Sequence, residues 1–117
     1  MNPRDLVAAA VQGDDLTARQ LVKDAAREGF SWAHAPALDF TGLRDRAVYA
    51  SLVELQSSRA GQAPPDWTRD VGAAPEQVFL VRAAQTSNAV LRESLENTPE
   101  PLKKRNIFAL PDYLKVL

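Results

Sequence analysis

The sequence contains no cysteine, one histidine and five glycines among its 117 residues. Without cysteine, the chain can form neither a disulfide framework nor a thiolate metal site. A metal site built from several histidines is excluded too, and any serine–histidine catalytic pair would have to use His34. With so few glycines, no run resembles the glycine-rich cradle of a phosphate-binding loop, so a nucleotide-binding fold has little support.

Long apolar runs and an excess of charge of one sign are also missing. No stretch approaches the roughly 20 uninterrupted apolar residues that a membrane-spanning helix needs. The N-terminus, "MNPRDLVAAAVQGDD", carries acids where a secretory signal has a longer apolar run, so we expect no export and a cytoplasmic location. The 14 lysines and arginines are matched by 15 aspartates and glutamates. Because DNA-binding domains usually carry a clear basic excess, this balance disfavours nucleic acid as a partner.

What the sequence does contain is an apolar fraction of 45%, which is enough for one globular core. A chain of this length is expected to fold as a single domain. We predict an all-α fold, a compact helical bundle of about five to six helices with a proline-rich joint in the middle. The predicted parts of residues 1–117 are an N-terminal helical half (1–60), the joint (61–74) and a C-terminal helical half (75–117).

The first two helices are predicted mainly from the residues at their ends. Asn2 favours a helix start, and Gly13 favours its end in a left-handed conformation. The second helix starts at Asp14 or Asp15. Gly29, followed by an aromatic residue, predicts a Schellman ending for it.

Apolar residues spaced three and four apart give the second and third helices one inward-facing side. The third and longest helix covers about residues 41–59 and ends at Gly61. The predicted stripe of the second helix consists of Leu16, Ala18, Leu21, Val22, Ala25 and Ala26. The predicted stripe of the third consists of Leu43, Ala47, Val48, Ala50, Leu52, Val53 and Leu55.

The C-terminal half gives a less decisive pattern. "QAPPDW" predicts a stiff extended joint, which we expect Trp67 to fasten to the core. "PEQVFLVRAA" fits either a short helix opened by Pro75 or a strand, and we favour a helix because no second strand is evident for residues 76–84. A further helix in "SNAVLRESLEN" starts at Ser87. Its predicted inward-facing residues are Val90, Leu91 and Leu95.

No set of residues predicts a catalytic, cofactor or metal site. His34 has no nucleophile and orienting carboxylate that the sequence would bring to it, so we interpret it as structural or exposed. Asp14 and Asp15 lie where helix capping explains them. Glu93 and Glu96 are three residues apart on one helix, which is typical of a solvated face. We therefore predict a protein that is not an enzyme and uses no cofactor.

The run "GDDLTARQLVKDAAREGF" also admits an interpretation as part of a DNA-binding helix-turn-helix. The candidate base-reading residues would be Thr17, Arg19, Gln20 and Lys23. The same helix carries Asp14, Asp15, Asp24 and Glu28, which would repel the DNA backbone. An ordinary amphipathic helix explains the run better.

The segment "TPEPLKKRNIFALPDYL" is the strongest candidate for contact with a partner. Lys103, Lys104 and Arg105 stand in it between two prolines, just before the apolar pair Ile107 and Phe108. One interpretation is a packed C-terminal segment, in which the apolar side chains join the core while the cations stay hydrated. The other is a docking surface, on which arginine supplies bidentate contacts and aromatic side chains supply buried area.

Two stretches, "RAGQAPPDWTRDVGAAPEQVFLVRA" and "LRESLENTPEPLKKRNIFALPDYL", resemble an uncharacterised family of small bacterial helical proteins. The shared features are a proline-rich approach to a Trp-Thr pair, "PE-x-VFLVR", "PEPL" before a basic triplet, and a closing "P-[DE]-[FY]-L". The resemblance covers roughly residues 59–114. The chain departs from the pattern at Lys103 and Lys104, where arginines are more usual, and this weakens any argument from bidentate contacts.

The resemblance implies a protein partner and assigns no catalytic residues. Such proteins are often encoded beside nucleotidyltransferase-like proteins, in arrangements that resemble toxin–antitoxin pairs. The expected function is therefore that of a non-enzymatic protein-binding module, an antitoxin-like protein that covers the active cleft of a nucleotidyltransferase-type toxin. The alternative is a nucleic-acid-binding transcriptional regulator, and a homo-oligomer is compatible with both. The predicted partner-binding residues are Trp67, Arg82, Lys103, Lys104, Arg105 and Phe108.

Overall fold

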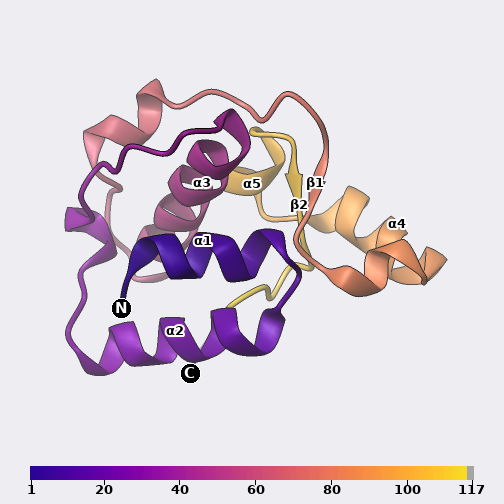
Figure 1. The fold of residues 1–117 in the computed structure, drawn as a ribbon, viewed down its shortest axis with the longest axis horizontal. Coiled ribbons are helices and arrows are strands. Elements are labelled where there is room, and N and C mark those ends of the chain that lie inside the picture. The colour runs from indigo at the N-terminus through magenta and orange to yellow at the C-terminus, as the bar shows by residue number, and fades with distance from the viewer. Residues whose placement is uncertain (116–117) are drawn as a thin grey trace.

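Five α-helices and one pair of two-residue strands make up the regular structure of residues 1–115, which are the residues that the computed structural model describes (Figure 1). The predicted compact, mostly helical fold is confirmed, and the radius of gyration is 13.1 Å. The α-helices are α1 (Pro3–Val11), α2 (Asp15–Arg27), α3 (Leu43–Arg59), α4 (Asn88–Asn97) and α5 (Glu100–Lys103). The 3₁₀ helices are η1 (Trp32–His34), η2 (Asp66–Asp70) and η3 (Arg82–Gln85). The strands are β1 (Val78–Phe79) and β2 (Ile107–Phe108).

Side chains cap the N-termini of α1, α2 and α4 as the sequence predicts. The side-chain oxygen of Asn2 accepts from the N–H of Arg4 at 2.9 Å, and Asp14 accepts from the N–H of Thr17 at 3.1 Å. Ser87 caps α4 in the same way, since its hydroxyl oxygen accepts from the N–H of Val90 at 3.3 Å. Each bond satisfies an N–H group that the helix itself leaves without an acceptor.

Glycines end α1, α2 and α3 in the predicted left-handed conformation, with φ between 70° and 74° at Gly13, Gly29 and Gly61. After α2, the N–H of Phe30 donates to the carbonyl of Ala25 at 2.9 Å, which is the long bond of a Schellman motif. The same long backbone bond follows α1 and α3. These three endings are therefore set by the local sequence.

Gly13 is under a second constraint, because a Cβ at this position would lie 3.1 Å from the Cβ of Arg82. We expect Gly13→Ala to lower the free energy of unfolding by about 1–2 kcal/mol, since an L side chain is strained in the left-handed region. Urea denaturation measures the effect. Gly72→Ala is the matched control, because Gly72 has no atom within 4 Å of such a Cβ and no positive φ. A similar loss in both variants would contradict the prediction.

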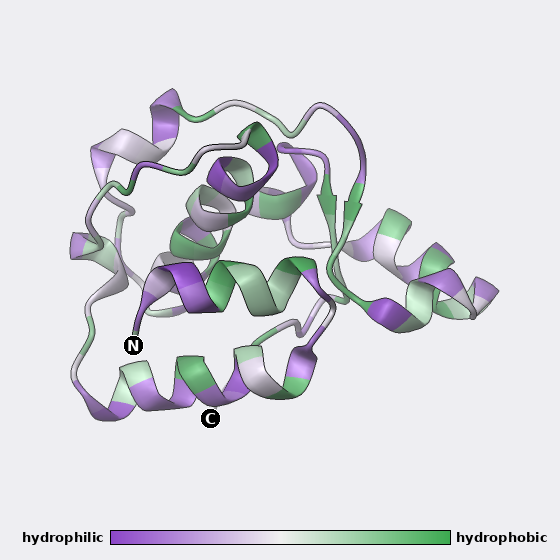
Figure 2. Cartoon of the chain, in the orientation of Figure 1, coloured by the Kyte–Doolittle hydropathy of each residue, from purple (hydrophilic) through white to green (hydrophobic). Residues whose placement is uncertain are grey.

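The core is built around α3, which packs against α1, α5, η1 and η2. Figure 2 shows apolar residues concentrated in α1, in α3 and in the two strands. Every residue of α3 from Ala47 to Leu55 is buried, so this helix is covered on all sides. Trp67 fastens the proline-rich joint to this core as predicted. Its ring stacks on Tyr49 with centroids 5.2 Å apart, and its indole N–H donates to the carbonyl of Ala35 at 2.8 Å.

The predicted apolar stripes are wrong at their first residues, and also at Ala26, which is exposed. Leu16 is 82% exposed and Leu43 is 60% exposed. Each lies in the first turn of its helix, Leu16 at the second residue of α2 and Leu43 at the first of α3, and the buried residues of these helices begin at Ala18 and Ala47. Helical spacing predicts which side of a helix faces inward, but not how far along the helix its neighbours reach.

The predicted helix over residues 76–84 is wrong, because part of this segment is a strand. Val78 pairs with Ile107 and Phe79 with Phe108 in a parallel register. The N–H of Val78 donates to the carbonyl of Asn106, and the N–H of Leu80 donates to the carbonyl of Phe108, both at 3.0 Å. The second strand lies inside the segment where the sequence predicts only packing or docking. Asn106 has a φ of 67°, which ends the turn after α5 immediately before this strand.

The helix α4 lies at one end of the molecule, away from α1, α2 and α3 (Figure 1). It packs mainly against η3. Ser94 is its buried residue, whereas Val90, Leu91 and Leu95 are half-buried and do not belong to the core cluster. The prediction that these three side chains face the core is therefore wrong. No helix among residues 1–115 combines the length and the apolar character required to cross a bilayer.

Candidate functional site

The structure separates the basic triplet into three different environments. Lys103, at the end of α5, is exposed. The ammonium of Lys104 lies 2.9 Å from a carboxylate oxygen of Glu54 on α3. Arg105 is only 3% exposed. The prediction that all three cations stay hydrated is therefore wrong for Arg105, and the triplet does not form one surface patch.

Arg105 is buried because the surrounding chain accepts its hydrogen bonds. Its guanidinium forms an ion pair with Glu54, which is 7% exposed. It also donates to the carbonyls of Thr68 at 2.7 Å, Val71 at 3.2 Å and Pro101 at 3.3 Å. A buried guanidinium is tolerated when its charge is paired and its donors are satisfied. Arg105 thereby ties α3, α5 and the proline-rich joint together.

The carboxylate of Glu54 has a strongly altered pKa. Burial alone would raise the pKa of Glu54, but hydrogen bonds from Arg105, Lys104 and Thr68 outweigh burial and lower it to about 2. The charged form is therefore the stable one in the folded chain at neutral pH. The buried pair of Glu54 and Arg105 therefore serves the fold.

Of the predicted partner-binding residues, Phe108 is also buried, at the β2 position that pairs with Phe79. The two rings stack with centroids 5.4 Å apart. Trp67 is half-buried by its contact with Tyr49. Contact with a partner therefore stays a prediction for Trp67, Arg82, Lys103 and Lys104, whereas Arg105 and Phe108 do not lie at the surface that such a contact would use.

Arg82 is the predicted residue that lines a hollow, and it lies where two hollows meet. The first hollow, of about 250 Å³, is lined by Gly13, Asp15, Arg19, Val81, Arg82, Ala83, Leu110, Asp112 and Tyr113. The second, of about 220 Å³, is lined by Val11, Gln12, Gly13, Phe79, Arg82 and Gln85. The third, of about 280 Å³, is lined by Val11, Arg44, Ala74, Pro75, Glu76, Gln77, Val78 and Phe79.

Neighbouring hollows share wall residues and lie in a row, which is called here the β1 groove. The first and second hollows share Gly13 and Arg82, and the second and third share Val11 and Phe79. One wall is the chain from residue 74 to residue 85. The other wall is formed by the end of α1, the start of α2 and the start of α3, and residues 110–113 close the first hollow. The groove is thus built by segments that are far apart in the sequence.

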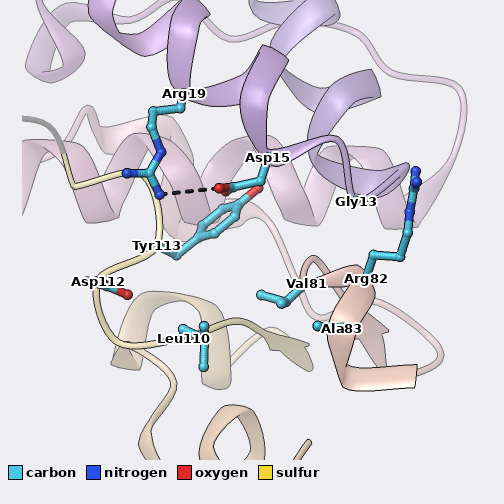
Figure 3. A pocket seen from close by; sticks show the side chains of 9 residues that line it. All are labelled: Gly13, Asp15, Arg19, Val81, Arg82, Ala83, Leu110, Asp112 and Tyr113. Atoms are coloured by element: carbon cyan, nitrogen blue, oxygen red, sulfur yellow. Dashed lines mark hydrogen bonds and ion pairs between the residues drawn. The ribbon is translucent and has the colours of Figure 1, made fainter. Parts of the chain in front are cut away.

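The first hollow has an apolar floor and a charged rim (Figure 3). Asp15 accepts a hydrogen bond from Arg19 at 3.2 Å across its upper edge. Tyr113 reaches up beside Asp15, and its hydroxyl is buried without a hydrogen-bond partner among the described residues. Burial, and then the charge of Asp15, raise the pKa of the Tyr113 hydroxyl. Both signs of charge are present at this rim, so it favours no simple ion.

The two large apolar side chains that are most exposed are neighbours of groove residues. Leu16 follows Asp15, which lines the first hollow, and Leu43 precedes Arg44, which lines the third. Single exposed leucines are common on protein surfaces, so these two do not by themselves mark a binding site.

His34 takes part in no catalytic arrangement within residues 1–115. It is exposed, and its Nδ1 lies 2.8 Å from the hydroxyl of Ser31. In the same part of the chain, no group of three or more histidine, aspartate or glutamate side chains is placed to hold a metal ion.

Comparison with known proteins adds no further guide, because no family model, curated protein or solved structure matches this chain. Of the residues that line the groove, Arg82 is the one that the sequence analysis named for partner binding, and it missed the others, among them Phe79, Gln85 and Tyr113. The one usable signal was "VFLV", whose β-branched and aromatic residues are typical of a strand.

Proposed function

We propose that this chain is a non-enzymatic protein-binding module, the antitoxin-like partner of a nucleotidyltransferase-type toxin. The family resemblance suggests the class of partner, and the β1 groove supplies a surface for it. The observation that carries the proposal is the row of three hollows along residues 74–85, lined in part by apolar side chains.

The composition of the groove favours a protein over a small molecule. Each hollow has a volume below the roughly 300–1,000 Å³ of typical small-molecule pockets, and the contact between Gly13 and Arg82 separates the first hollow from the second. Apolar side chains, neutral amides and charges of both signs alternate along it. Such a mixture is typical of protein interfaces, in which buried apolar contacts are surrounded by a polar rim.

The alternative, a nucleic-acid-binding regulator, gains no support from the basic triplet. A phosphate-binding patch requires cations that are free at the surface. Arg105 is buried against Glu54, and Lys104 is paired with the same carboxylate. Two of the three cations are thus occupied within the fold.

In the proposed mechanism, the module covers its partner's active cleft and so blocks access of the nucleotide substrate. Neutralisation then requires binding only, with no chemical step on either chain. Because partner contacts in a small interface are dominated by a few residues, one groove residue is expected to matter much more than its neighbours. Arg82 is the candidate, since it lines two of the hollows and its side chain is exposed.

The proposal is tested by co-expressing the chain with the nucleotidyltransferase-like product of its neighbouring gene and measuring complex formation by titration calorimetry. We expect a stable complex, and we expect Arg82→Glu to weaken it at least tenfold. Arg27→Glu is the matched control, because Arg27 is an exposed arginine at the far end of α2 from the groove. Absence of a complex overturns the proposed function, and equal effects of the two substitutions remove the groove as its docking surface.

Lys103→Ala tests whether the remaining free cation of the triplet contributes to the same complex. Substituting all three cations together would confuse binding with folding, because Arg105 is part of the core. A loss of affinity in Lys103→Ala with unchanged thermal stability would extend the docking surface to α5. Unchanged affinity would limit that surface to the groove.

A further inference from the structure

The strand β1 has a hydrogen-bonding partner on one side only. The N–H groups of Val78 and Leu80 donate to β2, and strand geometry directs the N–H and carbonyl of Phe79, between them, to the opposite side. Within residues 1–115, the N–H groups of Gln77 and Val81 donate to no backbone or side-chain acceptor. Residues 77–81 therefore present an unpaired strand edge, which is a template for another extended chain.

The β1 groove runs along this same segment. Residues 74–79 line the third hollow, Phe79 and Arg82 line the second, and Val81–Ala83 line the first. An extended chain advances about 3.3 Å per residue, so a segment of similar length can lie along the third and second hollows as far as Arg82. The contact between Gly13 and Arg82 separates these two hollows from the first. An α-helix, about 10–12 Å across with its side chains, is a poorer match for three small separate hollows. A cavity of about 150 Å³ holds a benzene ring, so each hollow has room for one large side chain.

The charges of the groove indicate what the middle of such a segment carries. The second hollow has one charged side chain among its described lining residues, Arg82. Its Nη2 donates to the carbonyl of Gln12 at 2.9 Å, and no carboxylate of residues 1–115 forms an ion pair with it. The nearby Asp14 is engaged elsewhere, since it caps α2; the hydrogen bonds of Thr17, and then the charge of Arg82, lower the pKa of Asp14. A guanidinium with free donors matches a carboxylate, which it can bind through two parallel bonds.

The first and third hollows do not favour a negatively charged side chain in this way. In the third, Arg44 is accompanied by Glu76, and it also pairs with the adjacent Asp45 at 3.0 Å. In the first, Arg19 pairs with Asp15, and Asp112 is also present. Both outer hollows also contain apolar walls. The third hollow suits a neutral, largely apolar side chain of the bound segment.

We propose that an extended segment of the partner protein binds in the β1 groove as an added strand on the free edge of β1 and places an acidic side chain on Arg82. This inference rests on the proposed function and specifies its binding mode. Backbone hydrogen bonds to the edge supply affinity, and the hollows supply specificity through alternate side chains.

The test uses synthetic 12-residue peptides that tile the nucleotidyltransferase-like product of the neighbouring gene, with binding measured by fluorescence anisotropy. We expect one region of the partner to bind, through peptides that contain Asp or Glu. Phe79→Pro removes the outward N–H and is expected to reduce affinity at least tenfold relative to Phe79→Val, which keeps that N–H but also lacks the ring. Gln77→Pro, compared with Gln77→Ala, repeats the test at the neighbouring edge position and decides it if Phe79→Pro fails to fold.

The role of Arg82 is tested by a double-mutant cycle on the same peptide. Replacing its acid with the matching amide should weaken binding to the natural chain about tenfold, and should have little further effect on Arg82→Gln. Equal affinities of the proline variants and their controls overturn the added strand, and additive effects in the cycle overturn the contact with Arg82.

Other occupants of the groove give different results. If the full-length partner binds but none of its peptides does, a folded surface occupies the groove and the inference is wrong, while the proposed function stands. If the chain alone forms a dimer that Phe79→Pro disrupts, a second copy is the occupant and the inference is again wrong. If the full-length partner does not bind at all, the proposed function and this inference fall together.

Discussion

Replacing Arg105 with alanine is expected to lower the free energy of unfolding by about 3–5 kcal/mol. The substitution leaves the carboxylate of Glu54, which is 7% exposed, without its buried counter-ion. It also leaves the carbonyls of Thr68, Val71 and Pro101 without their donor. A loss of this size is a large fraction of the about 5–15 kcal/mol that typically stabilises a domain. Chemical denaturation followed by circular dichroism measures it.

Lys103→Ala is the matched control for this experiment, since it removes a neighbouring cation that is exposed. Exposed substitutions of this kind usually change stability by no more than about 0.5 kcal/mol. A small effect of Arg105→Ala, similar to that of the control, would mean that the guanidinium is hydrated and that the triplet is a surface feature after all. The result therefore also decides how mutations in this segment should be interpreted in binding experiments.

We also expect the protein to lose stability in acid, because of the titration of Glu54. The pKa of Glu54 is about 2 in the folded chain, compared with its ordinary value of 4.5. Because the folded chain holds the charged form more tightly, this contribution is fully present above about pH 4.5 and is lost as the pH falls toward 2. The size of the shift corresponds to roughly 3 kcal/mol. Protonation of one carboxyl group would then remove much of the stability of the domain.

Glu54→Gln separates this contribution from the titration of other carboxylates. At neutral pH the variant should be less stable than the natural chain by roughly 3 kcal/mol, because Arg105 keeps its charge without a counter-ion. The two stability curves should converge as the pH falls from about 5 to 2, whereas Glu76→Gln, at an exposed position, should follow the natural chain throughout. A constant gap between the natural chain and Glu54→Gln across this range would show that Glu54 does not titrate as described.

The buried ion pair has a consequence for the docking proposal. Arg105 lies one residue before Asn106, whose carbonyl accepts the first hydrogen bond from β1. Loss of the pair therefore acts on the segment that positions β2, and through β2 on the strand that forms the groove wall. Changes at Arg105 are expected to weaken partner binding indirectly, so stability has to be measured beside affinity for every variant in this region.

The helix boundaries of the N-terminal half were predictable because the interactions that set them are local. Asn2 and Asp14 cap helices with bonds to residues two and three positions away. Gly13, Gly29 and Gly61 end helices through backbone conformations that other residues adopt only with strain. The balance of charge and the absence of a long apolar run are likewise properties of composition. The sequence by itself therefore determined a small helical domain and where most of its helices begin and end.

The tertiary structure alone decided the features on which function depends. Glu54 and Arg105 are 51 residues apart, and no local pattern distinguishes an arginine that will be buried from one that stays hydrated. Val78 pairs with Ile107 across 29 residues, and the groove joins the end of α1 to residues 74–85. In each case the side chain or strand is stabilised only by a partner that the folded chain brings to it. The physical reason is that pairing and burial are properties of two surfaces together, whereas capping and helix termination depend on a few consecutive residues.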